Sequence, residues 1–306
     1  MEQRQLGRTG PRVSVVGLGC NNFGMRIDAA ASAAVVHAAL AAGVTHFDTA
    51  EMYGGGDSET FLGAALGARR KDVVIATKFL PRPKDQSYAP GVVRKRIREG
   101  CEGSLRRLAT DYIDLYYEHQ PDPDAPLEEI LGAFDELIAE GKIRSAAGSN
   151  YPAPRIQTVA PRGTLCALQE EWSLLNRTIE KEVAPAARRA GMGIVTFFPL
   201  ASGMLTGKYR RGEEPPADTR FAAWPMLKGV LSSENFDRVE SLKAFAESRG
   251  HSITEVAIAW LAARPEVASI IAGATSPAQV AANVAGAGWH LTPADLAEID
   301  RLSPAV

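Results

Sequence analysis

The stretch Val-Thr-His-Phe-Asp-Thr-Ala-Glu-Met-Tyr-Gly, residues 44–54, opens as a strand and ends as a loop. Valine, threonine and phenylalanine favour extended backbone, and the glycines at 54–56 break any helix that would follow directly. A carboxylate, Asp48, and a phenol, Tyr53, are therefore predicted at the carboxyl end of a strand. Taken alone, Asp48 is better explained as a helix N-cap, and Tyr53 as loop packing.

The same strand-then-helix unit recurs along the chain. Short strands are predicted at residues 15–20, 45–49, 73–78, 112–119, 143–149, 165–172, 193–200 and 267–272. They are mostly apolar rather than alternating, as parallel strands buried on both faces should be. Helices are expected between them, including residues 91–108, 127–140 and 179–190. We therefore expect an α/β fold, a (β/α)8 TIM barrel with an N-terminal β-hairpin at residues 6–16 and extra C-terminal helices, as one domain over residues 1–306.

An open doubly wound sheet is the rival architecture for such a pattern. Its Gly-x-Gly-x-x-Gly fingerprint should follow the first strand and open a helix. Gly17, Gly19 and Gly24 are wrongly spaced for it, and no helix is expected to open there. The closed barrel is therefore favoured.

Composition narrows the class of protein. The chain has 306 residues, 45% of them hydrophobic, and a net charge of -2, which implies no general attraction to nucleic acid or anionic membranes. Its three cysteines show no Cys-x-x-Cys spacing, so neither a disulfide scaffold nor a metal site is predicted. The N-terminus lacks the apolar core of a signal peptide. We expect a soluble, cytoplasmic protein of unknown oligomeric state.

Polar side chains are predicted at the ends of several strands, which in a barrel would all point to one rim. A lysine that ends the apolar strand at 73–78 needs a partner, because an unpaired buried ammonium is expensive, and Asp48 on the neighbouring strand is the candidate. A lysine beside a tyrosine favours the phenolate and so lowers the phenol pKa. Asp48, Lys78 and Tyr53 therefore indicate a tuned proton donor, and His119 on the same rim indicates a group that faces substrate.

Taken together, these motifs resemble those of the aldo-keto reductase superfamily. They lie, in the order typical of that family, at residues 47–54, 77–78, 117–122, 148–150, 169, 199–209 and 273–277. The resemblance covers nearly the whole chain. It implies a barrel that binds a nicotinamide cofactor in extended form and transfers hydride directly to an aldehyde or ketone.

The resemblance also implies roles for four residues. Tyr53 matches the general acid that protonates the carbonyl oxygen, and Lys78 matches the residue that lowers its pKa. Asp48 matches the partner of that lysine, and His119 matches the residue that orients and polarises the carbonyl. The protein would contribute orientation and electrostatics, and the cofactor would carry the hydride.

Cofactor contacts follow from the same resemblance. Serine, asparagine and glutamine at two strand ends match the groups that hold the nicotinamide carboxamide, and a phenylalanine matches the ring that stacks on it. The implied cofactor-binding set is Asp48, Ser149, Asn150, Gln169, Phe197, Leu200, Gly203, Leu205, Lys208, Gly273, Ser276, Gln279 and Asn283. Many members of the family bind a 2′-phosphate with basic residues at two positions that are occupied here by Gly273 and Gln279. Neither residue is basic, which weakens the case for a strict NADP(H) preference. The family pattern still favours NADP(H), with NAD(H) possible.

Substrate contacts are expected from rim loops and strand ends, at Asn22, Phe23, Met52, Tyr53 and His119. This mixed aromatic and amide set fits a small-molecule carbonyl or alcohol and does not choose among them. Neither nucleic acid nor a membrane is an expected partner.

Two other functions compete with a reductase. One is a non-catalytic sensor subunit that binds the nicotinamide cofactor, similar to the channel-associated members of the superfamily. The other is a Schiff-base aldolase in which Lys78 attacks a carbonyl, which would require Lys78 to be free of a carboxylate. Cofactor binding would separate the reductase from the aldolase, and turnover would separate it from the sensor.

Overall fold

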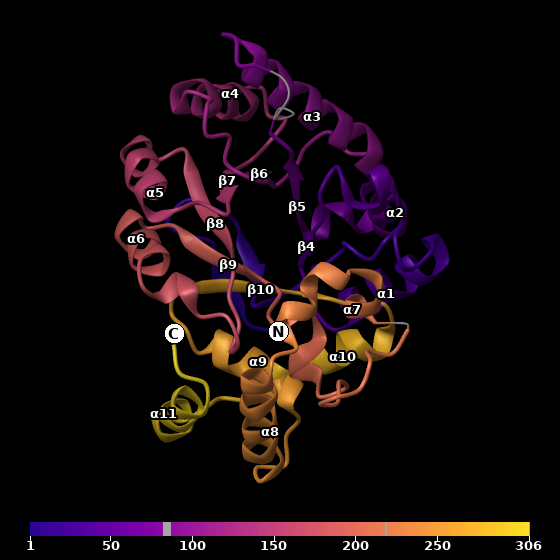
Figure 1. Ribbon diagram of the computed structural model, residues 1–306. Helices are drawn as coiled ribbons and strands as arrows, with labels where there is room; N and C mark the ends of the chain where they lie inside the picture. The colour runs from indigo at the N-terminus through magenta and orange to yellow at the C-terminus, as the bar shows by residue number, and fades with distance from the viewer. Residues whose placement is uncertain (82–86, 218, 306) are drawn as a thin grey trace.

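The computed structural model describes residues 1–81, 87–217 and 219–305. Within those residues, eight parallel strands form a closed barrel in the order β10-β3-β4-β5-β6-β7-β8-β9 (Figure 1). The strands are β3 (Val16–Gly19), β4 (His46–Asp48), β5 (Val74–Phe79), β6 (Leu115–Glu118), β7 (Ala146–Ser149), β8 (Leu165–Glu171), β9 (Gly193–Phe197) and β10 (Val267–Gly273). Because β10 pairs with both β9 and β3, the sheet has no free edge. The predicted TIM barrel is confirmed, and the open-sheet alternative is excluded.

Helices surround the barrel and cover the outer faces of its strands (Figure 1). They are α1 (Ala29–Ala41), α2 (Asp57–Leu66), α3 (Val92–Leu108), α4 (Leu127–Ala139), α5 (Ala153–Val159), α6 (Val183–Ala190), α9 (Ile253–Ala262) and α10 (Pro277–Gly286). Capping side chains begin some of them: Asp28 accepts the Ala31 N–H at the start of α1. Helix α6 begins at Val183, later than the predicted residue 179, because a separate turn at Thr178–Glu180 precedes it.

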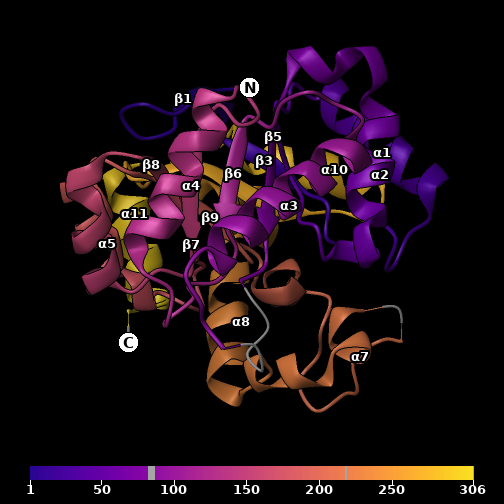
Figure 2. The ribbon, with the colours of Figure 1, turned by 90° about the horizontal axis from the view of Figure 1, so that it is seen from above.

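The N-terminal hairpin pairs β1 (Gln3–Gln5) with β2 (Arg12–Ser14). It lies at one end of the barrel, opposite the segment that carries α7 (Arg220–Ala223) (Figure 2). Leu6 and Val13 are fully buried and belong to the same apolar cluster as Leu115 and Ala167, so the hairpin fills the amino-terminal end of the barrel. The hairpin was predicted from residue 6 onward, but its first strand is three residues earlier, and residues 6–11 make the turn.

The carboxyl ends of the strands meet at the other end, so polar residues from distant parts of the sequence lie side by side. Asp48 is in register with Ala76, two residues before Lys78 on β5. Lys78 is in register with Tyr117 on β6, and Ser149 with Gln169 on β8. Closure of the barrel therefore gathers the predicted polar residues at one rim.

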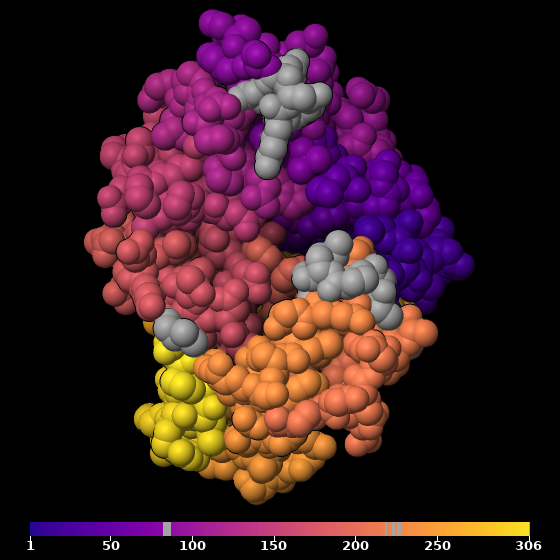
Figure 3. Space-filling view, viewed as in Figure 1, coloured from indigo at the N-terminus to yellow at the C-terminus, as the bar shows by residue number. Residues whose placement is uncertain are grey.

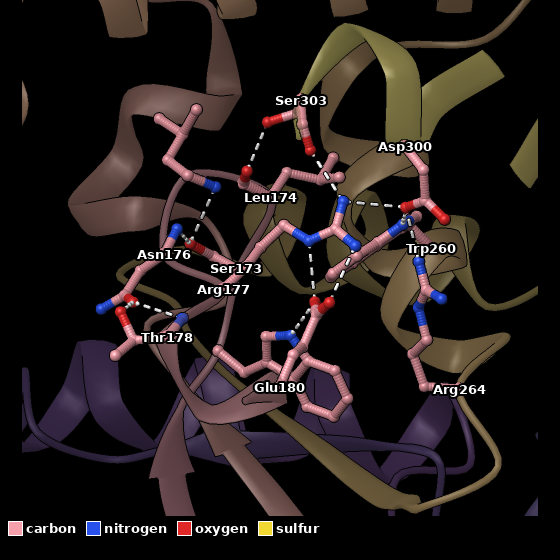
Figure 4. A network of polar contacts seen from close by, with 12 residues as sticks. Ser173, Leu174, Asn176, Arg177, Thr178, Glu180, Trp260, Arg264, Asp300 and Ser303 are labelled. Carbon is pink, nitrogen blue, oxygen red and sulfur yellow. Dashed lines mark hydrogen bonds and ion pairs between the residues drawn. The ribbon is translucent and has the colours of Figure 1, made fainter. Parts of the chain in front are cut away.

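The C-terminal helix α11 (Pro293–Leu302) packs against helix α8 (Ser233–Glu247) and is tied to the β8–α6 connection by a polar network (Figure 4). Arg177 donates to Glu180, to the Asp300 carboxylate at 2.9 Å and to the Ser303 carbonyl at 2.7 Å. Trp260 also donates to Asp300, at 2.9 Å. Arg177 thus links the end of the chain to the barrel. None of the helices in the described ranges combines the length and apolar character needed to cross a membrane.

Candidate active site

A cavity of about 520 Å³ opens at the carboxyl end of the barrel. Figure 3 shows this face hollowed near its centre, beside the segment that follows β9. Most of the predicted site residues line it: Asn22, Asp48, Tyr53, His119, Ser149, Asn150, Gln169, Phe197, Leu200, Gly203, Lys208, Gly273, Gln279 and Asn283. Its volume is in the range of small-molecule and cofactor sites.

The floor of the cavity contains a buried ion pair. Lys78 Nζ lies 2.5 Å from Asp48 Oδ1, and the two side chains are 0% and 4% exposed. The ammonium also donates to the Thr49 carbonyl at 2.8 Å. The other Asp48 oxygen accepts from Gln169 Nε2 at 2.7 Å. Burial alone would lower the pKa of Lys78, but Asp48 and Tyr53 raise it above its ordinary value, so Lys78 stays charged.

Tyr53 lies above this pair. Three successive glycines after it, at 54–56, have left-handed backbone angles, with φ of 59°, 66° and 105°, so the chain can turn sharply and present the ring to the cavity. The Lys78 ammonium lies 5.2 Å from the ring centroid. Burial raises the pKa of the Tyr53 phenol, while Lys78 lowers it through its charge and a hydrogen bond. The net direction is upward, so the effect of Lys78 has the predicted sign but is outweighed by burial.

His119 faces Tyr53 across the cavity. The two rings meet edge to face, with centroids 5.9 Å apart. Burial, reinforced by the charge of Lys78, lowers the pKa of His119 to about 3. The imidazole is therefore neutral at ordinary pH, with one N–H to donate and one nitrogen that can accept. It can polarise an oxygen without adding a second cation beside Lys78.

Amide and hydroxyl groups form one connected cluster next to these residues. Ser149 Oγ donates to the Gln169 carbonyl at 2.9 Å. Asn150 Nδ2 donates to both Ser149 Oγ and the His119 carbonyl, each at 3.0 Å. Asn150 has a left-handed φ of 61°, which asparagine tolerates better than most residues. The side-chain amide of Asn150 therefore couples the position of His119 to that of Ser149.

The far end of the cavity is lined by backbone, amide and basic groups. Gly273 leaves it open: an added Cβ there would meet the side chains of Asn21 and Asn22 at 3.4 Å. Gln279 accepts from the backbone N–H and the hydroxyl of Thr275 at 2.9 and 3.2 Å. Gly273 and Gln279, the two positions matched to basic residues that bind a 2′-phosphate, therefore offer only neutral groups to this end of the cavity.

Comparison with known proteins identifies the family. The family model described as "Aldo/keto reductase family" matches residues 15–304. This chain belongs to the aldo/keto reductase family.

Relatives within the family differ in their described roles. A probable voltage-gated potassium channel subunit beta of Oryza sativa subsp. japonica is 38% identical over 93% of this chain and 90% of the relative. An uncharacterised oxidoreductase of Bacillus subtilis is 36% identical over 89% of this chain and 87% of the relative. The solved holo form of an aldo-keto reductase from Bacillus halodurans matches with a TM-score of 0.83 and 30% identity, over 100% of this chain and 97% of that structure.

Two arginines line the cavity that sequence reasoning did not select. Arg26 lies on the β3–α1 loop, and Arg220 begins α7 in the long insert after β9. The Arg220 guanidinium stacks 5.2 Å from Phe198 and 5.3 Å from Trp224. Burial, and then the charge of Arg26, lowers the pKa of Arg220. Neither residue lies at a strand end, so the signal that found the other site residues could not find these.

Five of the predicted site residues lie away from the cavity surface. Lys78 lies beneath it, and Phe23 and Leu205 are fully buried in the hydrophobic core. Met52 is 50% exposed and does not line this cavity. Ser276 is the N-cap of α10 and accepts from the Gln279 N–H. The catalytic role of Lys78, and the assignment of the other four to substrate or cofactor, remain predictions from the family pattern.

Proposed function

We propose that this member of the family is an NAD(P)(H)-dependent oxidoreductase that interconverts an aldehyde or ketone and the corresponding alcohol by direct hydride transfer. Tyr53 would serve as the general acid and base. The observation that carries the proposal is the buried Asp48–Lys78 ion pair at 2.5 Å, placed beneath a tyrosine that faces His119 in one cavity. Burying a charge pair this completely costs desolvation free energy, which indicates a functional role for the pair. Its position beneath a tyrosine suits the tuning of a proton donor.

The side chains have complementary tasks in such a reaction. Tyr53 carries its proton in the described state, because burial raises its pKa, and so is ready to protonate a carbonyl oxygen. As the proton leaves, the charged Lys78 stabilises the phenolate that forms, and Asp48 keeps Lys78 charged. The neutral His119 donates a hydrogen bond to the same oxygen and fixes its position. In the reverse direction the phenolate takes the proton of the alcohol.

The cavity fits a nicotinamide dinucleotide in its chemistry. Ser149, Asn150 and Gln169 provide the amide and hydroxyl groups that would hold a carboxamide, and Phe197 provides a ring face. Lys208 lines the cavity near Gly203, where a pyrophosphate would need a cation. When bound, the cofactor supplies or accepts the hydride. The remaining chemistry belongs to the protein's own side chains.

Cofactor preference depends on the adenosine end. We favour NADP(H) on the family pattern. NAD(H) is possible, because Gly273 and Gln279 are not basic. Asn22, a predicted substrate contact, lies beside Gly273, and its buried Oδ1 has no partner among the described atoms. We propose a small carbonyl compound or alcohol as substrate and the reducing cytoplasm as compartment, which suits three free, buried cysteines.

The relatives named as channel β subunits favour a second candidate, a non-catalytic subunit that binds the cofactor as a sensor. Such a protein would bind NADPH or NADH and turn over no carbonyl substrate. The aldolase alternative has less support, because Lys78 donates to Asp48 and is not free to attack.

The test is a fluorescence titration of the purified protein with NADPH and NADH, followed by turnover on a panel of aldehydes and ketones. Tyr53→Phe should abolish reduction and leave cofactor affinity nearly unchanged, because it removes the proton donor and keeps the ring. Normal turnover in that variant would remove Tyr53 as the acid. Binding without turnover by the natural protein would favour the sensor, and no binding of either cofactor would overturn the proposal.

A further inference from the structure

A buried carboxyl group lies directly behind the cavity and is not used by the proposed chemistry. Glu170 follows Gln169 on β8 and is 6% exposed. Because successive strand residues face opposite sides, Gln169 points into the barrel and Glu170 points toward the surrounding helices. Glu170 makes no ion pair with any described residue. The cation close to this region, Arg155, pairs instead with Glu118 at 2.9 Å.

The contact that Glu170 does make is with the turn after β7. Its Oε1 accepts the backbone N–H of Tyr151 at 2.8 Å. The Tyr151 hydroxyl donates to Glu118, so this tyrosine is held at its backbone and at its ring by two buried carboxyl groups. Asn150, the residue before it, has the left-handed φ of 61°. A left-handed non-glycine residue persists only where its surroundings hold it.

Burial of the Glu170 carboxyl is costly, and its hydrogen bond to the turn offsets part of that cost. Burial raises its pKa to about 8, and the backbone N–H groups of Tyr151 and Asn150 oppose that rise. Its neighbour across the sheet, Thr196, leaves its own buried hydroxyl without a partner among the described atoms and does not satisfy the carboxyl. An apolar side chain would cost less at this strand position. We therefore attribute the presence of the carboxyl to its hydrogen bond with the Asn150–Tyr151 turn.

We infer that Glu170 is a positioning residue, whose side-chain oxygen fixes the Asn150–Tyr151 turn and thereby places Ser149, the Asn150 amide and His119. Asn150 Nδ2 transmits the effect, since it donates to Ser149 Oγ and to the His119 carbonyl. The functional part of this inference rests on the proposed function, in which these groups hold the nicotinamide end of the cofactor and the substrate carbonyl. The anchoring of the turn itself does not depend on it.

Two kinds of substitution separate positioning from bulk stability. Glu170→Gln keeps an acceptor oxygen in a group that cannot ionise, whereas Glu170→Leu removes the acceptor at similar volume. Glu170→Val, suited to a strand, is a second acceptor-free variant should the leucine variant not fold. Glu171→Gln and Glu171→Leu are matched controls on the next residue of β8, which is less buried.

The first measurement is hydrogen exchange of the Tyr151 amide in the protein without cofactor. We expect faster exchange in Glu170→Leu, and near-natural exchange in Glu170→Gln and in both Glu171 variants. The second is cofactor affinity by fluorescence: the Kd should rise about tenfold in Glu170→Leu and be restored in Glu170→Gln. The melting temperature of Glu170→Leu should change little, because removal of a costly buried carboxyl offsets the loss of the hydrogen bond from the Tyr151 N–H.

Equal behaviour of the glutamine and leucine variants would overturn the inference, because only the leucine variant lacks the acceptor. Unchanged Tyr151 exchange in Glu170→Leu would overturn it as well. A melting temperature that falls in parallel with affinity would assign Glu170 to general stability instead. If the natural protein bound neither cofactor, the proposed function would fail, while the exchange comparison would still decide whether Glu170 holds the turn.

Discussion

Removing either partner of the Asp48–Lys78 pair should destabilise the protein strongly, and removing both should cost less than the sum. Asp48→Asn leaves an ammonium that is fully buried, and Lys78→Met leaves a carboxylate that is 4% exposed. Loss of one partner of a buried pair costs about 3–5 kcal/mol of unfolding free energy. Lys78 retains the Thr49 carbonyl and Asp48 retains Gln169, so we expect the lower end, about 3 kcal/mol for each variant.

The double variant, Asp48→Asn with Lys78→Met, leaves no buried charge at the pair. A coupling energy of about 2 kcal/mol is expected between the two substitutions. Urea unfolding followed by circular dichroism measures all four proteins, and comparable slopes are required before midpoints are compared. Arg211→Met and Asp237→Asn form the matched control: that pair is also 2.5 Å long but 41% and 71% exposed, so each change should cost less than about 1 kcal/mol.

The pH dependence gives a second readout. The folded-state pKa of Lys78 is raised above its ordinary 10.5, so the stability that it contributes is present below about pH 10.5 and is lost as pH rises through the folded value. In Asp48→Asn, burial is no longer offset by the carboxylate, so stability should instead rise with pH from neutrality. Single variants that each cost under about 1 kcal/mol, or a double variant that costs their full sum, would refute the buried pair.

Three further predictions concern the cavity and the C-terminus. Gln279→Arg should raise kcat/KM for NADPH relative to NADH by adding a cation beside a 2′-phosphate; an unchanged ratio would place the adenosine elsewhere. The pKa of His119 is about 3, so its titration should leave no inflection in kcat/KM between pH 5 and 8. An inflection that is present in the natural protein and absent in His119→Gln would contradict the neutral imidazole. Arg177→Met should lower the unfolding free energy by about 2 kcal/mol, because it breaks the link to Asp300, and should speed proteolysis of the C-terminal helix; an unchanged urea midpoint would show that the network adds little.

Much of the barrel could be predicted because its signals are local. A run such as residues 73–78 is apolar on both faces, and that pattern alone indicates a buried parallel strand. The pairing of Lys78 with Asp48 also followed, because a lysine at the end of such a strand requires a carboxylate on its neighbour. Prediction was weaker at element ends: β1 begins before residue 6 and α6 after residue 179, where turns rather than hydrophobic pattern decide the boundary.

Several features of the site depend on distances that no local pattern contains. Arg220 reaches the cavity from an insert about twenty residues beyond β9, and only the folded chain brings it beside Phe198. Phe23 is adjacent in sequence to Asn22, yet the backbone turns it into the core while Asn22 lines the cavity. Sequence proximity to a motif therefore did not decide which side chain faces the cavity.

The sequence by itself determined the order of the eight strands, and with it the residue types gathered at the rim: carboxylate, ammonium, phenol and imidazole. It did so because the hydrophobic pattern locates each strand to within a few residues, and the barrel brings their carboxyl ends together. The tertiary structure decided their protonation. Lys78 lowers the pKa of Tyr53 as its charge requires, but burial outweighs it, and the same burial holds His119 neutral. That balance depends on how completely water is excluded, which only the packed structure determines.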